Sequence, residues 1–300
     1  MTIALSTMWM QNRATHVTAW FEQVRPLGFD RIELSHIITP AMIDGVVPGH
    51  LPVSSIHFPA PTVPHPSVPR PADDLLSSPD DELRAWAVEQ GRRSIDLAVS
   101  LGAEAICLHA GRVDMPGRYE WVVQQRYLGG AFGKPLYRQA LDTALAARAA
   151  AVEPHFSAAR RSLGELAAYA ETTGVRLGIE TRLQISEIPS LAEAQTLLEE
   201  HDPAVLGLWL DTGHVQVQAH LGLPALGEWL AACGPRVVGV HLHDTRGLRD
   251  HVLPGMGAVD FAFVAAHLPA QAVRVCEFDW YFTPDEILAA RHFLAHLGLS

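Results

Sequence analysis

Histidine, aspartate and glutamate residues recur along this chain in places from which they could bind a divalent cation. They lie in seven short segments, most of which end an apolar, β-rich run. The candidate metal ligands are His57, His109, Glu180, Asp211, His214, His241, His251 and Glu277. A mixture of imidazole nitrogen and carboxylate oxygen favours zinc, manganese, iron or cobalt over calcium or magnesium. Chemistry is therefore expected on one face of one domain.

The prediction of a metal site depends on several candidate ligands meeting at one point. A lone histidine at a strand end is more often hydrogen-bonded or solvated than bound to metal. Closing a barrel brings the C-terminal ends of separate strands within side-chain reach of one point. Carboxylates and imidazoles gathered there without a cation would leave unpaired buried charge, at a cost of roughly several kcal/mol. The pattern thus predicts a shared metal site.

The elements that must position these residues alternate regularly. Eight apolar, β-rich runs are separated by amphipathic helical patterns such as residues 80–101 and 156–173, which end before Gly102 and Gly174. The predicted strands cover residues 3–7, 31–35, 54–58, 105–110, 176–181, 206–211, 237–244 and 274–278. This order predicts a single (β/α)8 TIM barrel over residues 1–300. A doubly wound sheet is the alternative, but no Gly-rich phosphate loop follows the first strand.

Two insertions break the alternation, at about residues 59–79 and 111–135. Six prolines interrupt the chain from Pro59 to Pro71, directly after His57, and a segment rich in Gly, Arg and aromatic residues follows His109. Both leave the ligand-bearing face, where barrel loops most often carry function. Each is a candidate lid.

Composition narrows the range of partners. The formal net charge is −11 and Lys134 is the sole lysine, so no basic stripe exists for a nucleic-acid backbone. No apolar run reaches the roughly 18 residues of a membrane span, and the first ten residues lack the features of a signal peptide. The three cysteines share no metal-binding spacing and are interpreted as apolar core residues. We expect a cytoplasmic protein acting on a small polar metabolite, without nucleic-acid or membrane partners.

The spacing of SIHFP, CLHAG, GIET, LDTGH, VHLHD, HVLPGMG and VCEF resembles the xylose isomerase-like TIM barrel superfamily. This superfamily unites sugar (phosphate) isomerases and epimerases with phosphodiesterases of the endonuclease IV type, AP endonuclease family 2. The resemblance runs from about the third predicted strand to the eighth. For an isomerase or epimerase it implies one metal ion held by Glu180, Asp211, His241 and Glu277, with the two glutamates flanking the substrate.

For an endonuclease IV-like enzyme the resemblance implies up to three zinc ions. His57 and His109 would hold the first, and Glu180 would bridge it to a second ion on the four residues named above. His214 and His251 would hold the third together with an aspartate two residues before His251. Arg249 occupies that position here and Asp250 lies one residue late. Either Asp250 reaches the third ion through a shifted loop, or the site is dinuclear.

Three functions stay open at this point. Zinc- or manganese-dependent hydrolysis of a small phosphoester or phosphodiester, with two or three ions, is placed slightly ahead, because it explains His57, His109 and His251. Sugar isomerisation or epimerisation would need one ion, with Glu180 and Glu277 as acid and base. A metal-free binding module is the third. The predicted catalytic residues are Glu180, Glu277 and His214, the predicted substrate-binding residues are Arg112, Arg246 and Trp280, and His243 and Asp244 are expected to orient ligands.

Overall fold

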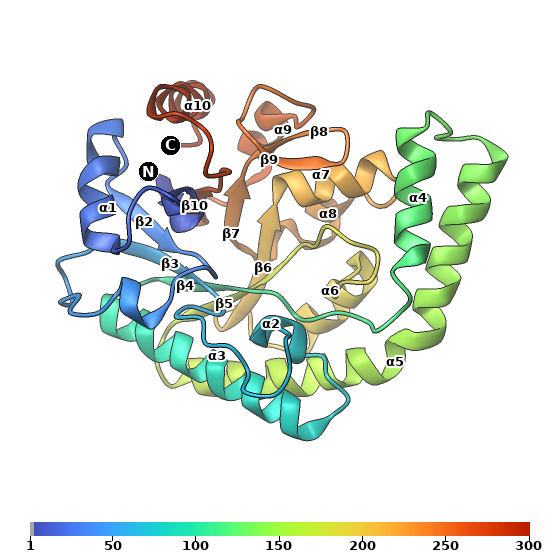
Figure 1. Ribbon diagram of the computed structural model, residues 1–300, viewed down its shortest axis with the longest axis horizontal. Coiled ribbons are helices and arrows are strands. Elements are labelled where there is room, and N and C mark those ends of the chain that lie inside the picture. Colours follow the sequence, from blue (N-terminus) through green and yellow to red (C-terminus); the bar gives the residue numbers. More distant parts are fainter. Residues whose placement is uncertain (1–2) are drawn as a thin grey trace.

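Parallel strands close a barrel in this computed structural model, which describes residues 3–300 (Figure 1). The eight barrel strands of that range are β1 (Ile3–Ser6), β2 (Arg31–Leu34), β3 (Val53–His57), β4 (Ala105–Leu108), β5 (Arg176–Glu180), β6 (Leu206–Asp211), β7 (Val237–Leu242) and β10 (Val273–Cys276). They neighbour one another in chain order, and β1 closes the ring by pairing in parallel with β10. The predicted (β/α)8 TIM barrel is confirmed, with strand ends that differ from prediction by one or two residues.

Helices cover the outside of the barrel between successive strands (Figure 1). The α-helices are α1 (Val17–Val24), α2 (Ala72–Leu75), α3 (Asp81–Leu101), α4 (Arg118–Leu128), α5 (Pro135–Glu171), α6 (Leu191–Glu199), α7 (Thr212–His220), α8 (Leu226–Cys233), α9 (Phe261–His267) and α10 (Pro284–His296). Short 3₁₀ helices are η1 (Thr7–Met10), η2 (Arg25–Leu27), η3 (Pro40–Met42) and η4 (Gly234–Arg236). As predicted, Asp80 caps the start of α3, and Gly102 ends it with a φ of 69°.

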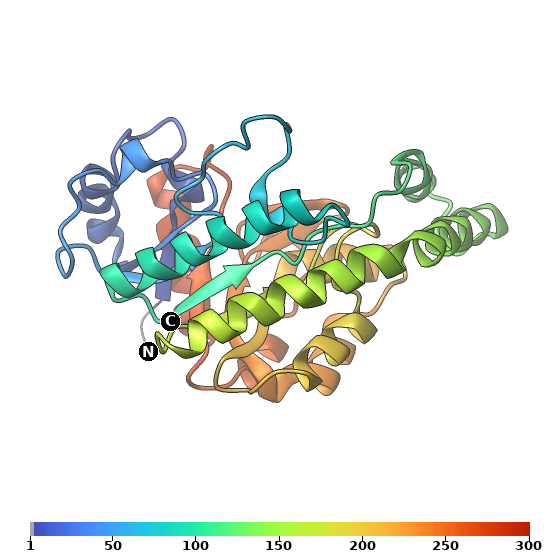
Figure 2. The same ribbon diagram turned by 90° about the horizontal axis from the view of Figure 1, so that it is seen from below.

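The second insertion and the helix after it differ from the prediction. Helix α5 begins at Pro135 and runs through Pro154, so the predicted helix over 156–173 is the end of a longer one. The Ala-rich stretch before Pro154 has high helix propensity, and Pro154 itself is exposed. The insertion at 111–135 contains α4, which pairs with the first part of α5; Figure 2 shows the two helices projecting beyond the barrel. This segment therefore forms a helical projection.

The first insertion reaches the site. Residues 58–71 form no regular element, and the short helix α2 that follows carries the buried Asp73.

A small antiparallel ribbon of β8 (Asp244–Arg246) and β9 (Arg249–Val252) follows β7. His251, which the sequence placed in a loop, lies in β9. No helix within residues 3–300 combines the length and the apolar character needed to cross a membrane.

Trp209 fills the barrel interior beneath the ligand-bearing ends of the strands. Its ring lies edge-on to His241, with 5.2 Å between the ring centroids. A Cβ atom built on Gly239 would come within 2.2 Å of the Trp209 ring, so the glycine in β7 makes room for the indole. The bottom of the site is thus closed by a large, fully buried side chain.

Candidate active site

His241, near the end of β7, is the centre of a group of buried carboxylates. Its Nδ1 atom lies 2.7 Å from Glu180 Oε1, 3.3 Å from Glu277 Oε2 and 3.6 Å from Asp211 Oδ2. These four residues come from β5, β6, β7 and the residue after β10. All four are buried, and one ligand atom from each lies within 4.8 Å of the others. The structure therefore brings together the four residues that the sequence assigned to one metal ion.

Glu33 is a member of this group that the sequence-based reasoning missed. It lies in β2, is fully buried, and accepts a hydrogen bond from His241 Nε2, which is 3.1 Å from Glu33 Oε1. Ser55 Oγ in β3 donates a second hydrogen bond of 2.8 Å to Glu33 Oε2. The available signal was an acidic residue inside the apolar run of residues 31–35, at the same end of a strand as the other ligands.

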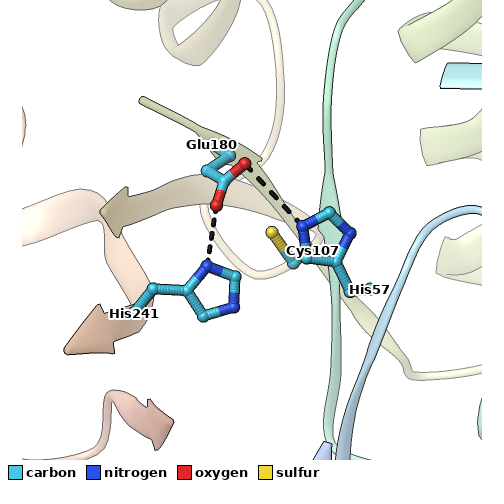
Figure 3. A group of neighbouring side chains, drawn as sticks. All are labelled: His57, Cys107, Glu180 and His241. Carbon is cyan, nitrogen blue, oxygen red and sulfur yellow. Dashed lines mark hydrogen bonds and ion pairs between the residues drawn. The ribbon is translucent and has the colours of Figure 1, made fainter. Parts of the chain in front are cut away.

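Glu180 is the most crowded carboxylate of the group. Figure 3 shows it between His241 and His57, whose Nε2 atom is 3.9 Å from Glu180 Oε2. The same oxygen accepts hydrogen bonds from His109 Nε2, at 2.6 Å, and from the guanidinium of Arg182. Burial by itself would raise the pKa of Glu180, but His109, His241 and Arg182 hold that pKa well below its usual range. The Glu180 side chain is therefore ionised in this environment.

Glu277 has the opposite tendency. Burial raises the pKa of the Glu277 carboxyl above its ordinary value, and the neighbouring carboxylate of Glu180 adds to the effect, while His241 and His251 offset part of it. Two glutamates that share one histidine nitrogen thus differ in their affinity for a proton. Such a difference separates the acid from the base in enzymes that use two carboxylates.

Histidines line the side of the site next to β3 and β4. His109 donates to Asp73 Oδ2 at 2.6 Å through Nδ1 and to Glu180 through Nε2. Burial and the charge of Arg182 lower the pKa of His109, but Glu180 and Asp73 outweigh them and raise it to about 9. His57 donates from Nδ1 to the Phe58 carbonyl, 3.0 Å away, and burial and the charge of His109 lower its pKa well below the usual value, so its Nε2 atom carries no proton. His36, which was not among the predicted site residues, lies beside this pair, with its ring centroid 5.1 Å from that of His57.

A separate group forms around His214 and His251. His214 donates from Nδ1 to the Thr181 carbonyl at 3.0 Å, so its Nε2 atom points elsewhere, 3.7 Å from Asp250 Oδ2. His251 Nε2 is 3.6 Å from the same oxygen. Asp250 therefore lies beside both histidines although the expected position of the aspartate is taken by Arg249. The three residues here whose ligand atoms all lie within 4.8 Å of one another are His214, His243 and His251, so a third ion held with Asp250 stays a prediction.

His243 and Asp244, the two residues expected to orient ligands, make different hydrogen bonds. His243 Nε2 donates to Asp211 at 2.9 Å, and its Nδ1 atom accepts from the backbone N–H of His251, so it orients a candidate ligand as predicted. Asp244 does not do so. Its carboxylate accepts from the backbone N–H groups of residues 245, 255, 257 and 259. The prediction for Asp244 is wrong because a tight Pro-Gly turn needs those acceptors for its own amides.

The contacts of the three predicted substrate-binding residues are with groups other than the buried carboxylates. Arg112 donates to Gln184 and Ser186, and Arg246 donates to the Met256 carbonyl. Trp280 is 44% exposed and packs edge-on against Tyr281. Two further arginines, Arg118 and Arg126, line the groove between α4 and α5. Binding of substrate by Arg112, Arg246 and Trp280 stays a prediction.

The chain is similar to a known protein family and to several solved structures. The model of the family described as xylose isomerase-like TIM barrel matches residues 71–294. No curated protein sequence matches the chain. Among solved structures, D-psicose 3-epimerase with D-tagatose from Clostridium cellulolyticum H10 has a TM-score of 0.68 at 15% identity, with 100% of each chain covered. A 3-keto-D-glucoside 4-epimerase from E. coli has a TM-score of 0.66 at 18% identity, again over 100% of each chain.

A third similar structure is an IOLI protein with a bound zinc atom, with a TM-score of 0.68 and 14% identity over 100% of this chain and 98% of that one. At such low identity these likenesses show a shared fold. The chemistry of this chain must be argued from its own side chains.

Proposed function

Because the chain belongs to the xylose isomerase-like TIM barrel family, we propose that it is a metal-dependent sugar epimerase or isomerase in which Glu180 and Glu277 act as base and acid. One observation carries this proposal: two buried glutamates from separate strands approach the same nitrogen of His241, at 2.7 and 3.3 Å, with Asp211 beside them. The similar structures that are sugar epimerases support it.

The donor set fits a divalent cation. Three carboxylates and one imidazole converge in a buried space, and without a cation their negative charges would be poorly compensated. Glu180, Asp211, His241 and Glu277 would hold the ion, and a similar structure contains zinc. When bound, a divalent ion supplies Lewis-acid polarisation of a substrate carbonyl.

Glu180 and Glu277 supply the proton transfers. Glu180, as the base, removes the proton from the carbon next to the carbonyl, giving an enediolate, and Glu277, as the acid, returns a proton to that carbon or its neighbour. The electrons of the C–H bond form the C=C bond of the enediolate while the C=O bond becomes C–O, and reprotonation re-forms a C=O bond, so no oxidant is needed. The lowered pKa of Glu180 and the raised pKa of Glu277 match these two tasks.

Arg182 argues against the bridged pair of ions that phosphodiester hydrolysis would use. A bridging Glu180 would need Oε2 free for an ion between His57 and His109, but that oxygen already accepts from Arg182 and His109. Arg182 is itself buried and also pairs with Glu187. A guanidinium at that position disfavours a second cation by like-charge repulsion. Hydrolysis, placed first from the sequence, therefore gives way to the isomerase alternative.

An unphosphorylated sugar suits the surroundings better than a sugar phosphate. The buried guanidinium of Arg182, beside Glu180, already donates to two carboxylates, Glu180 and Glu187, so a phosphate would have to displace one of them. An unphosphorylated sugar would displace no such ion pair, and the exposed face of Trp280 could stack on its ring.

Exchange of carbon-bound hydrogen with solvent tests the proposal without knowledge of the true substrate. The chain is stripped with chelator, reloaded with Mn²⁺ and incubated in D₂O with D-tagatose, D-psicose or L-ribulose, and the deuterium at the carbons beside the carbonyl is followed by NMR. We expect metal-dependent incorporation with at least one ketose. Hydrolysis of bis(p-nitrophenyl) phosphate by the same loaded protein, with no incorporation into any ketose, would overturn the proposal.

A further inference from the structure

We propose that Glu33 is a positioning residue that holds the His241 ring so that Nδ1 points at Glu180, Asp211 and Glu277. Glu33 does not approach those ligand atoms itself and contacts the far nitrogen of the ring. The inference rests on the metal site of the proposed function and adds a residue to it. The His241 ring thus contacts Glu33 through Nε2, and its Nδ1 atom faces the three other carboxylates.

The contacts of Glu33 leave its carboxylate little freedom. Both of its oxygens face His241 Nε2, at 3.1 and 3.3 Å, and Ser55 Oγ donates to one of them at 2.8 Å. Glu33 and His241 are both 0% exposed, so water does not compete for these hydrogen bonds. Within residues 3–300, the side-chain hydrogen bonds of Glu33 are those with His241 and Ser55.

The tautomer of His241 follows from this contact. The carboxylate oxygens of Glu33 are acceptors, one of them already for Ser55 Oγ, so the Nε2 atom of His241 is the donor and carries a proton. The remaining nitrogen, Nδ1, is then the one that can give its lone pair to a cation. The ring plane is fixed as well, because His57 stacks on one face at 5.4 Å with an interplanar angle of 7° and Trp209 lies against it edge-on. A carboxylate behind a metal-binding histidine commonly raises metal affinity in this way.

Titration of Mn²⁺ into chelator-stripped protein, followed by calorimetry, tests the inference in the absence of any substrate. Two variants separate orientation from charge. Glu33→Gln keeps the reach of the side chain and removes its charge, whereas Glu33→Asp keeps the charge and withdraws the carboxylate from Nε2. We expect each variant to weaken Mn²⁺ binding by about 10- to 100-fold, with melting temperatures of the metal-free proteins no lower than that of the wild type.

Glu120→Gln is the matched control, because Glu120 is a buried glutamate that bonds to Ser186 and contacts no member of the site. It should bind Mn²⁺ as the wild type does. If either Glu33 variant binds Mn²⁺ within twofold of the wild-type affinity, the inference is overturned. That result in Glu33→Asp would mean that only the negative charge of Glu33, and not its contact with Nε2, affects Mn²⁺ binding. Failure of the wild type to exchange deuterium while it still binds Mn²⁺ would remove the proposed function and leave this test intact.

Discussion

At the scale of single residues, the two glutamates of the site show how environment differentiates identical side chains. Both are buried, but Glu180 is surrounded by His109, His241 and Arg182, which favour its ionised form. For Glu277, burial outweighs the opposing effect of His241 and His251, so its pKa is raised. Burial without a partner penalises charge, whereas burial with hydrogen-bonded cations preserves it.

Replacing either glutamate by glutamine should remove one proton transfer while preserving size. We expect Glu180→Gln and Glu277→Gln each to lower kcat for deuterium exchange by about 10²- to 10⁴-fold. The measurement is the initial rate of incorporation with Mn²⁺ in excess. Turnover at the wild-type rate in Glu277→Gln would assign the acid to another group.

His57 tests the choice between the two chemistries. Its Nε2 atom is 3.9 Å from Glu180, and neither proton transfer passes through it. His57→Ala should lower kcat/KM for exchange by less than about tenfold, which is about 1.4 kcal/mol of transition-state stabilisation. Loss of all activity in this variant, with Mn²⁺ still bound, would instead favour a dinuclear enzyme.

At the scale of elements, the strands of the barrel are shaped around Trp209. The indole lies inside the barrel and needs glycine on the neighbouring strand β7, where Gly239 precedes His241 by two residues. The strand that presents the central histidine is therefore also the one that accommodates the largest side chain beneath it. Packing and site geometry are coupled through β7.

Gly239→Ala should destabilise the protein, because the new methyl would lie 2.2 Å from an aromatic ring with no room to move. Overpacking of this kind typically costs about 1–3 kcal/mol. Urea unfolding followed by circular dichroism measures it. Gly164→Ala is the control, since Gly164 lies in α5 with open space around its Cβ position, and it should be neutral or stabilising by up to about 1 kcal/mol. Equal stabilities for the two variants would contradict this account of β7.

At the scale of the whole molecule, folding concentrates negative charge in the centre of the barrel. Glu33, Glu180, Asp211 and Glu277 come from strands that are far apart in the sequence and meet at His241. A cation bound there would be bound by the folded chain and not by the unfolded one. Metal binding and folding are therefore linked.

Removing metal should lower the thermal stability. At an ion concentration of 100 times Kd, binding contributes about 2.7 kcal/mol, which corresponds to a shift on the order of 5 °C in melting temperature. Scanning calorimetry with excess Mn²⁺ and with EDTA measures the difference. Asp211→Asn, which lacks one ligand, should show a much smaller shift. Identical melting temperatures for the wild type under both conditions would contradict a metal site in the barrel.

The sequence by itself determined the fold and most of the site. Alternating apolar runs and helical patterns specify a parallel barrel because strands buried on both faces need continuous hydrophobic residues. His57, Glu180, Asp211 and His241 were identifiable because each ends such a run, and parallel strands present their C-terminal ends at one face. Such patterns involve residues that are close together in the sequence, so they can be recognised without a structure.

Tertiary structure alone decided how these residues interact. Glu33 pairs with His241 across 208 positions, Asp73 with His109 across 36, and Arg182 occupies the Glu180 oxygen that a second ion would need. Asp250 lies beside His214 because of the backbone of a ribbon that was expected to be a loop. Hydrogen bonds and ion pairs depend on distances of tenths of an ångström between distant segments, and those distances are set by packing of the whole barrel.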